Sequence, residues 1–307
     1  MNIIISGCLG HIGSRLTRHL TEKHYSIIGI DNLSTQRYGS LRGLIGSNNF
    51  KFFNEDLSKI NQSELSNLIN KKDIGAWIHL AATTNAADSF DFKNELFMNN
   101  LKSTRLAIDF CKDNGLHFIF PSSTSVYGSA ESKVDESSDK FLNPQSPYAE
   151  CKIKEEELIK QELDDNYQIL RLGTIFGISP GIRFHTAVNK FCFQACLGTP
   201  LTVWKTALHQ YRPYLEIQDC CNSFEFFLKN KEKKGVYNVN TNNFTVDNII
   251  SEIKKNIPDC EIEFVSNKIM NQLSYFVSNQ KILNEGFRFQ GTLSKSIKET
   301  IHWLRVE

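Results

Sequence analysis

The chain has 307 residues, of which 40% are hydrophobic and 22% charged, and its 35 basic and 34 acidic side chains nearly cancel. These values are ordinary for one α/β domain with a smaller appended lobe, and they disfavour nucleic acid or another polyanion as a partner. The first residues lack the pattern of a secretory signal and no apolar run is long enough to span a bilayer, so we expect a cytoplasmic protein without a membrane partner.

Short β-branched segments alternate with helical patterns through the first half of the chain. The predicted strands cover residues 2–6, 26–30, 50–53, 76–80, 118–121 and 168–172. Such alternation predicts an α/β fold in which a doubly wound parallel sheet of the Rossmann type carries helices on both faces. We therefore expect a dinucleotide-binding domain over residues 1–172, to which a later segment near 214–240 returns.

The pattern changes after Gly173. A helix is predicted over residues 186–197, a strand over 201–204, and a helix over 293–304, where apolar residues recur at helical spacing. We interpret residues 173–307 mainly as a smaller substrate-binding lobe over the carboxyl edge of the sheet.

The eight cysteines show neither a CxxC pair nor the spacing of a zinc site. Cys192 and Cys196 lie four residues apart in an apolar helical pattern, which is more typical of a buried helix face than of metal ligands. The sequence therefore predicts free thiols and no metal site.

A glycine-rich loop follows the first predicted strand. In Gly7-Cys8-Leu9-Gly10-His11-Ile12-Gly13, the first glycine permits a sharp turn, the second a close approach to a pyrophosphate, and the third close helix packing. Three glycines alone are also found in ordinary structural turns. The position of this loop between a strand and a helix favours a dinucleotide site.

The second predicted strand ends at Asp31, eighteen positions after Gly13. A carboxylate there accepts hydrogen bonds from the adenosine ribose and repels a 2′-phosphate, which favours NAD over NADP. Two alternatives stay open at this point: Asp31 caps its own turn, or the nearby Arg15 and Arg37 bind NADP.

Tyr148 is the one tyrosine among nine that has a lysine four residues later, Lys152. Ser146 and Pro147 have the character of an N-cap and a first helical residue, so both side chains are expected on one face of an opening helix. The ammonium would lower the pKa of Tyr148 from about 10 toward neutrality. The alternative is an exposed pair on a helix surface.

Hydroxyl side chains cluster where the fifth predicted strand ends, in Pro121-Ser122-Ser123-Thr124-Ser125. Open α/β sheets bind ligands at this carboxyl edge, where Ser123 would orient a substrate alcohol toward Tyr148. A serine-rich strand end is also common in ordinary loops.

With these pieces the chain resembles the extended short-chain dehydrogenase/reductase family, in its nucleotide-sugar epimerase/dehydratase branch. The likeness covers nearly the whole length, and it is carried by GCLGHIG, DNLS, Asp56-Leu57, HLAA, Asn100 with Thr104, SSTSVYG, YAECK, RLGTIFG and RPYLEIQD.

The resemblance implies a role for each matching position. The residues expected to perform proton transfer are Ser123, Tyr148 and Lys152. Those expected to hold NAD are Gly7, Gly10, His11, Ile12, Gly13, Asp31, Asn32, Asp56, Leu57, Leu80, Ala81, Ala82, Asn100, Tyr148 and Lys152. Those expected to contact a nucleotide-diphosphate sugar are Thr124, Ser125, Thr174, Arg183, His185 and Arg212, of which Arg212 matches a residue that binds the diphosphate.

The resemblance also ranks the reactions, all of which begin with oxidation of the sugar to a 4-keto form. Dehydratases of the branch carry an Asp-Glu pair where this chain has Thr124 and Ser125, so a 4,6-dehydratase is disfavoured. Epimerase comes first and a C4 dehydrogenase or reductase second, while a non-catalytic dinucleotide-binding regulator is the alternative outside enzymes.

Two departures from the family pattern leave the base and the sugar unassigned. Thr174 replaces an asparagine of the pocket, and residues 205–210 replace a Gly-Asp-Gly turn. Members commonly form dimers through two helices per subunit, and the matching segments, 96–111 and 152–163, predict a homodimer.

Overall fold

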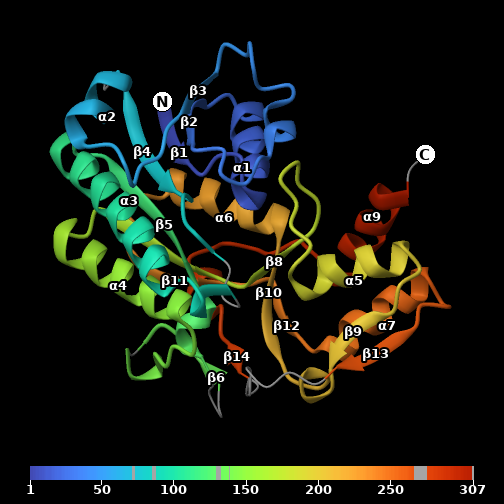
Figure 1. Ribbon diagram of the computed structural model, residues 1–307. Coiled ribbons are helices and arrows are strands. Elements are labelled where there is room, and N and C mark those ends of the chain that lie inside the picture. The colour runs from blue at the N-terminus through green and yellow to red at the C-terminus, as the bar shows by residue number, and fades with distance from the viewer. Residues whose placement is uncertain (71–72, 85–87, 129–132, 138, 266–274, 306–307) are drawn as a thin grey trace.

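The larger lobe contains a seven-stranded sheet in which every pair of neighbouring strands is parallel. The computed structural model describes residues 1–70, 73–84, 88–128, 133–137, 139–265 and 275–305 (Figure 1). Across the sheet the strands are β11 (Gly235–Val239), β7 (Tyr167–Leu172), β5 (His117–Ser123), β4 (Ile74–His79), β1 (Asn2–Ser6), β2 (Ser26–Asp31) and β3 (Phe50–Asn54). The predicted Rossmann-type α/β fold is confirmed.

Strand β1 shows why these segments form a buried parallel sheet. Ile3, Ile4 and Ile5 are all fully buried, because helices cover both faces. Successive side chains of a strand point to opposite faces, so Ile3 and Ile5 belong to one apolar cluster and Ile4 to the other.

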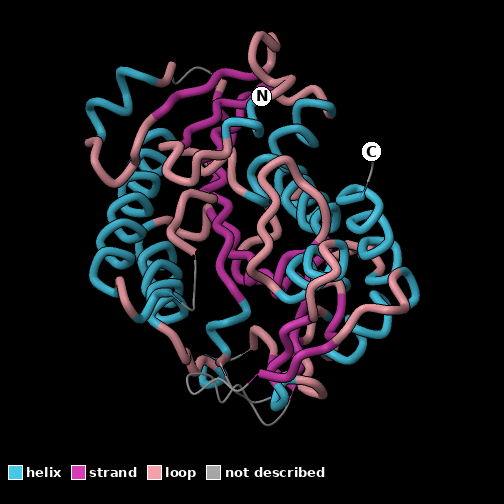
Figure 2. The backbone as a smooth tube through the Cα atoms, turned by 45° about the vertical axis from the view of Figure 1, so that its right-hand side comes forward, coloured by secondary structure: helices cyan, strands magenta, loops and turns pink. Residues whose placement is uncertain are grey.

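Helices cover the two faces in two groups, as Figure 2 shows for the strands at the centre of the molecule. Helices α1 (His11–Glu22) and α6 (Ile217–Lys229) pack on the face that holds Ile3 and Ile5. Helices α2 (Gln62–Leu68), α3 (Lys93–Asn114) and α4 (Pro147–Glu162) cover the other face.

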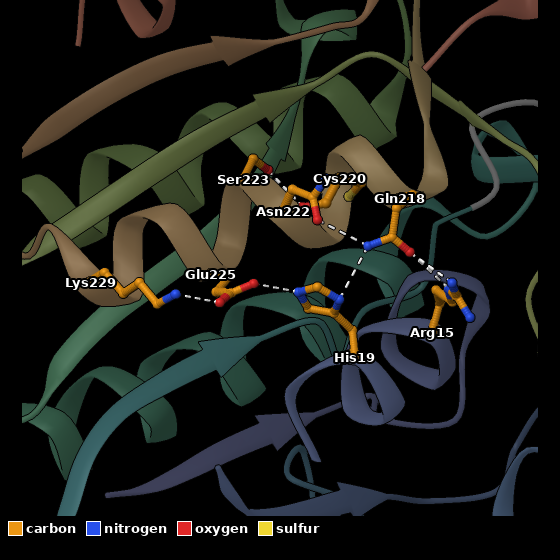
Figure 3. A network of polar contacts seen from close by, with 8 residues as sticks. All are labelled: Arg15, His19, Gln218, Cys220, Asn222, Ser223, Glu225 and Lys229. Atoms are coloured by element: carbon orange, nitrogen blue, oxygen red, sulfur yellow. Dashed lines mark hydrogen bonds and ion pairs between the residues drawn. The ribbon is translucent and has the colours of Figure 1, made fainter. Parts of the chain in front are cut away.

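A polar network joins α1 to α6 (Figure 3). The Arg15 guanidinium donates to Gln218 Oε1 at 2.7 Å, and the amide nitrogen of Gln218 lies 3.1 Å from His19 Nδ1. His19 Nε2 lies 2.6 Å from a Glu225 carboxylate oxygen. These contacts hold α1, which follows the glycine-rich loop, on its neighbour, and they direct Arg15 toward α6.

The second lobe is built from small sheets and three helices (Figure 1, lower right). Its strands are β12 (Asn242–Phe244), β10 (Arg212–Glu216) and β8 (Thr174–Phe176) in one sheet, and β13 (Ile262–Val265) with β9 (Leu201–Trp204) in another. Helices α5 (Ala187–Cys196), α7 (Val246–Asn256) and α9 (Leu293–Arg305) share an apolar cluster that contains the buried Cys192. Elements α5, β9 and α9 confirm the three predicted segments of this lobe.

The chain returns to the main sheet after β10, through α6 and β11. The exact division into domains stays a prediction. The remaining elements are short: β6 (Lys133–Val134) pairs with β14 (Phe276–Val277), α8 covers Gln280–Asn284, and single 3₁₀ turns cover Tyr38–Leu41, Asp88–Phe90, Thr124–Tyr127, Asp139–Phe141 and Lys205–Ala207. Within the described ranges, none of the helices has the length and apolar character that crossing a bilayer requires.

Candidate active site

The glycine-rich loop has the geometry of a phosphate cradle. Gly7 adopts φ +72°, and a Cβ there would lie 2.6 Å from the carbonyl carbon of Leu80, while a Cβ at Gly13 would overlap the Gly7 carbonyl oxygen. A Cβ at Gly10 would meet the Gly7 carbonyl oxygen at 3.5 Å, an ordinary contact distance, so Gly10 is less crowded than Gly7 and Gly13. Helix α1 starts after Gly10 without a side-chain cap, which leaves its first amides for an anion.

His11 opens α1 and is 8% exposed. Its Nδ1 lies 2.7 Å from Ser179 Oγ, and its buried Nε2 has no hydrogen-bond partner among the described residues. Burial and the charges of Arg183 and Arg37 lower the pKa of His11 to about 3, so the imidazole is neutral. The orphaned ring nitrogen and the uncapped first amides of α1 fit the pyrophosphate of a dinucleotide.

The segment after β8 lies directly on this loop. The Gly181 amide donates to Ser14 Oγ at 2.9 Å, and a Cβ at Gly181 would lie 2.7 Å from the carbonyl oxygen of Gly10. Sequence reasoning missed these contacts, because they join residues 168 and 167 positions apart in the chain and no motif at Ser179 or Gly181 points to the loop.

Asp31 lies at the end of β2 beside the loop. Its carboxylate accepts hydrogen bonds from the Leu9 amide at 3.0 Å and from the Leu33 amide at 2.9 Å. The carboxylate thus caps its own turn, as one alternative held, and also ties that turn to the cradle. Arg37 is half-buried and interacts electrostatically with Asp31, whereas Arg15 is bonded to α6.

The two residues expected at the adenine end lie together. Asn32 is hydrogen-bonded to Asp56, whose carboxylate also accepts from the Ser58 amide at 3.0 Å. Although burial raises it, the pKa of Asp56 is lowered on balance by these hydrogen bonds. Leu57 is buried in the apolar cluster on the α3 face.

Strand β4 ends next to the cradle, where the Leu80 amide donates to the Ser6 carbonyl at 2.8 Å and Ala81 and Ala82 are half-buried. The fully buried Asn100 holds the following turn, because its amide accepts from the Thr83 N–H at 2.8 Å and donates to the Thr83 carbonyl at 3.1 Å. In the structure Asn100 therefore supports the backbone turn at Thr83, which follows β4.

Helix α4 begins as expected, with Ser146 Oγ accepting from the Ala149 amide at 3.2 Å and Pro147 in the first turn. Lys152 is 2% exposed, and its Nζ lies 5.9 Å from the Tyr148 ring centroid and 4.4 Å from that of Phe120 on β5. Since Lys152 is buried, the alternative of an exposed helix pair does not hold.

The pKa of Tyr148 moves in the direction opposite to the prediction. Burial raises this pKa above its ordinary value, and the charges of Lys152 and Arg183 only partly oppose the rise. The prediction took only the ammonium into account, whereas removal of the phenol from water has the larger effect on this pKa.

The hydroxyl cluster lies at the end of β5, against which α4 packs. Ser123 Oγ accepts from the Ser125 amide at 3.1 Å, which leaves its proton free to be donated. The Thr124 hydroxyl donates a hydrogen bond to the Leu172 carbonyl at 3.2 Å. Ser125 Oγ is buried without a hydrogen-bond partner in the described part of the chain.

The expected substrate residues approach the site from the second lobe. Arg183 donates to Thr84 Oγ1 and interacts electrostatically with Tyr148, and His185 is exposed nearby. Thr174 is half-buried in β8.

Arg212 begins β10, and its guanidinium lies 4.9 Å from the Tyr275 ring centroid. Its Nη2 is a buried atom without a hydrogen-bond partner among the described residues, as expected of a group that awaits an anion. The sequence analysis did not single out Tyr275, whose ring packs against the Arg212 guanidinium, because no motif surrounds this tyrosine.

A model of the NAD-dependent epimerase/dehydratase family matches residues 3–240. The chain belongs to this family. Its members are extended short-chain dehydrogenases/reductases that use NAD and act on nucleotide sugars.

Curated relatives match over most of the chain. The trifunctional UDP-glucose 4,6-dehydratase/UDP-4-keto-6-deoxy-D-glucose 3,5-epimerase/UDP-4-keto-L-rhamnose-reductase of Arabidopsis thaliana is 28% identical over 98% of this chain and 47% of its own length. The dTDP-D-glucose 4,6-dehydratase of Dictyostelium discoideum is 30% identical over 80% of this chain and 59% of its own length. The chain thus spans about half the length of the plant relatives it matches.

Solved structures share the whole fold. The UDP-glucuronic acid 4-epimerase of Bacillus cereus, in complex with UDP-glucuronic acid and NAD, superimposes with a TM-score of 0.87 at 25% identity over 99% of both chains. The UDP-glucose 4-epimerase of Thermotoga maritima shares the fold, with a TM-score of 0.88 at 20% identity over 99% of both chains.

Proposed function

We propose that the protein is a nucleotide-sugar epimerase that works through a 4-keto sugar. The observation that carries this proposal is the buried Lys152 beside Tyr148, next to a strand end that offers hydroxyls at Thr124 and Ser125. A dehydratase needs a carboxyl group there to protonate the leaving hydroxyl, and neither residue supplies one. The similarity to the Bacillus cereus 4-epimerase over the whole chain supports the same reading.

The glycine-rich loop of Gly7, Gly10 and Gly13 would hold NAD, which would supply the acceptor and donor of the C4 hydride when bound. Once Tyr148 has lost its own proton, the phenolate accepts the proton of the C4 hydroxyl, and the charge of Lys152 lowers the cost of forming that phenolate. Ser123 donates a hydrogen bond to the forming carbonyl oxygen. In the return step Tyr148 gives the proton back to the same oxygen, so the chain undergoes no net change.

The substrate diphosphate is assigned to Arg212, whose buried Nη2 lacks a partner in the described structure. Guanidinium groups suit this role because they present paired donors to phosphate oxygens. We assign Arg183 to the same substrate nearer to the reacting sugar, because this guanidinium interacts electrostatically with Tyr148.

The test begins with denaturation of the purified protein and identification of any released dinucleotide by mass spectrometry. Fresh protein is then incubated with UDP-, GDP-, dTDP- and CDP-sugars. Isomerised sugar without net cofactor turnover is the expected result. Stoichiometric NADH formation or consumption would instead show a C4 dehydrogenase or reductase, and loss of water from the sugar would show a dehydratase. A protein that binds no dinucleotide would contradict the proposal as a whole.

A further inference from the structure

A buried carboxylate lies next to the proposed catalytic pair, Tyr148 and Lys152. Glu155 is fully buried one turn after Lys152 on α4, and its Oε2 lies 3.1 Å from Lys152 Nζ. Its Oε1 accepts a hydrogen bond at 2.6 Å from Thr104 Oγ1 on α3, and Thr104 is fully buried too. Apart from Lys152, Oε2 has no partner in the part of the chain that the structure describes.

The other groups around Lys152 are neutral. His79 on β4 is hydrogen-bonded through Nδ1 to Ser6 Oγ, at 2.8 Å. Burial, together with the charge of Lys152, lowers the pKa of His79 to about 3. Burial raises the pKa of Cys151 to about 12, so this thiol keeps its proton. The ring of Phe120 closes another side. Among the described groups, Glu155 is therefore the formal negative charge that faces Lys152.

The charge of this cluster decides how easily it loses a proton. With Glu155 ionised, the phenol of Tyr148, the ammonium and the carboxylate sum to zero, and loss of a proton leaves a buried net negative charge. Without the carboxylate the same loss takes the cluster from a net positive charge to zero, which is easier in a medium of low dielectric. Arg183, the remaining charged neighbour of Tyr148, is the same in both cases.

We propose that Glu155 is a positioning residue that keeps Lys152 charged and in place and raises the pH at which the Tyr148–Lys152 pair gives up its first proton. Because the two groups titrate together, the statement concerns the pair rather than either residue alone. The inference rests on the proposed function in so far as Tyr148 is the proton acceptor. The consequence of the Glu155 charge is that the Tyr148–Lys152 pair keeps its first proton up to a higher pH.

The experiment titrates Tyr148 without any sugar. The ultraviolet absorbance of tyrosinate is followed against pH in the purified full chain, free and saturated with NAD, and the signal of Tyr148→Phe is subtracted to isolate Tyr148. Circular dichroism defines the pH range in which each protein is folded. For Glu155→Gln we expect the Tyr148 transition about one pH unit lower than in the wild type, as for loss of a nearby like charge.

Three variants control for structure. Glu157→Gln removes the same charge from an exposed position of the same helix and should titrate like the wild type. Glu155→Asp restores the charge and should return the transition toward the wild-type pH, which a role in packing alone would not do. Thr104→Val removes the hydroxyl donor but keeps the carboxylate, so the Tyr148 transition should not fall below the wild-type pH.

An unchanged or raised transition in folded Glu155→Gln would overturn the inference. If Glu155→Gln does not fold, Glu155→Met, which is uncharged and similar in length, decides, and a wild-type transition in that variant would overturn the inference as well. The proposed function can fail separately: a protein that shows the shift but transforms no nucleotide sugar retains the inference and loses the epimerase assignment.

Discussion

The cofactor side and the substrate side of the site are built in different ways. The phosphate cradle is made by backbone within one short stretch, in which Gly7, Gly10 and Gly13 set the path of the chain. The substrate side depends on side chains from distant segments, such as Arg183, which reaches a residue 99 positions earlier. Backbone sites follow from local sequence, whereas side-chain sites depend on how lobes and loops are packed.

The largest effect should come from the residue that joins the two sides. Tyr148→Phe removes the proposed proton acceptor, and the proposed epimerisation should fall by about 10³-fold. Most of the NAD should still be retained, because Tyr148 is one of many residues expected to contact the dinucleotide and the phosphate cradle does not depend on the phenol. Activity and mass spectrometry of released dinucleotide check both statements. Tyr38→Phe, at an exposed position, is the matched control. Loss of NAD from Tyr148→Phe would show that the two sides are not separable.

The substrate side should respond to loss of a single cation. Arg212→Ala removes the charged donor assigned to the diphosphate, and KM for the nucleotide sugar should rise about tenfold to a hundredfold while kcat changes little. Steady-state kinetics and NAD binding measure the split. Lys298→Ala, an exposed cation of the same lobe, should behave as the wild type. An unchanged KM in Arg212→Ala would show that another residue binds the diphosphate.

The cofactor side should be sensitive to a single methyl group. At Gly13 a Cβ would overlap backbone of the loop, so Gly13→Ala should lower the free energy of unfolding by about 1–3 kcal/mol and weaken NAD binding. Denaturant unfolding and calorimetric titration with NAD measure the two effects. At Gly39 nothing lies within 4 Å of an added Cβ, so Gly39→Ala should be neutral. Equal effects at both positions would mean that packing against the loop is not the cause.

The smallest effect concerns the pH dependence of stability. The folded pKa of His11 is about 3, below the ordinary 6.5, so the unfolded chain takes up a proton that the folded chain does not. Stability is therefore lost as the pH falls below 6.5. Relative to His11→Asn, the wild type should lose about 1 kcal/mol between pH 6.5 and about 5.5. Unfolding at both pH values measures the difference.

His24→Asn is the control for that comparison, because His24 is exposed. The wild type and this variant should show the same change with pH. The depressed pKa of His79 is common to all three proteins and cancels in the difference. A slope for His11→Asn equal to that of the wild type would show that His11 is not buried as a neutral ring.

Much of the larger lobe was predictable from the sequence by itself. Runs such as Ile3–Ile5 are apolar at every position because both faces of the sheet are covered. The glycines of the loop, the acid at the end of β2 and the Ser146-Pro147 start of α4 are local signals. Predictions from such local signals hold in the folded structure because they depend only on the backbone and on residues close in sequence.

The tertiary structure decided what depends on distance and burial. It brought Ser179 to His11, Tyr275 to Arg212 and Thr104 to Glu155, pairs that no spacing in the sequence relates. It also reversed the expected direction of the Tyr148 pKa, because the cost of removing a phenol from water exists only once the lobes and helices enclose it. Side-chain identity was readable in the sequence, whereas the electrostatic environment of each side chain was set by packing.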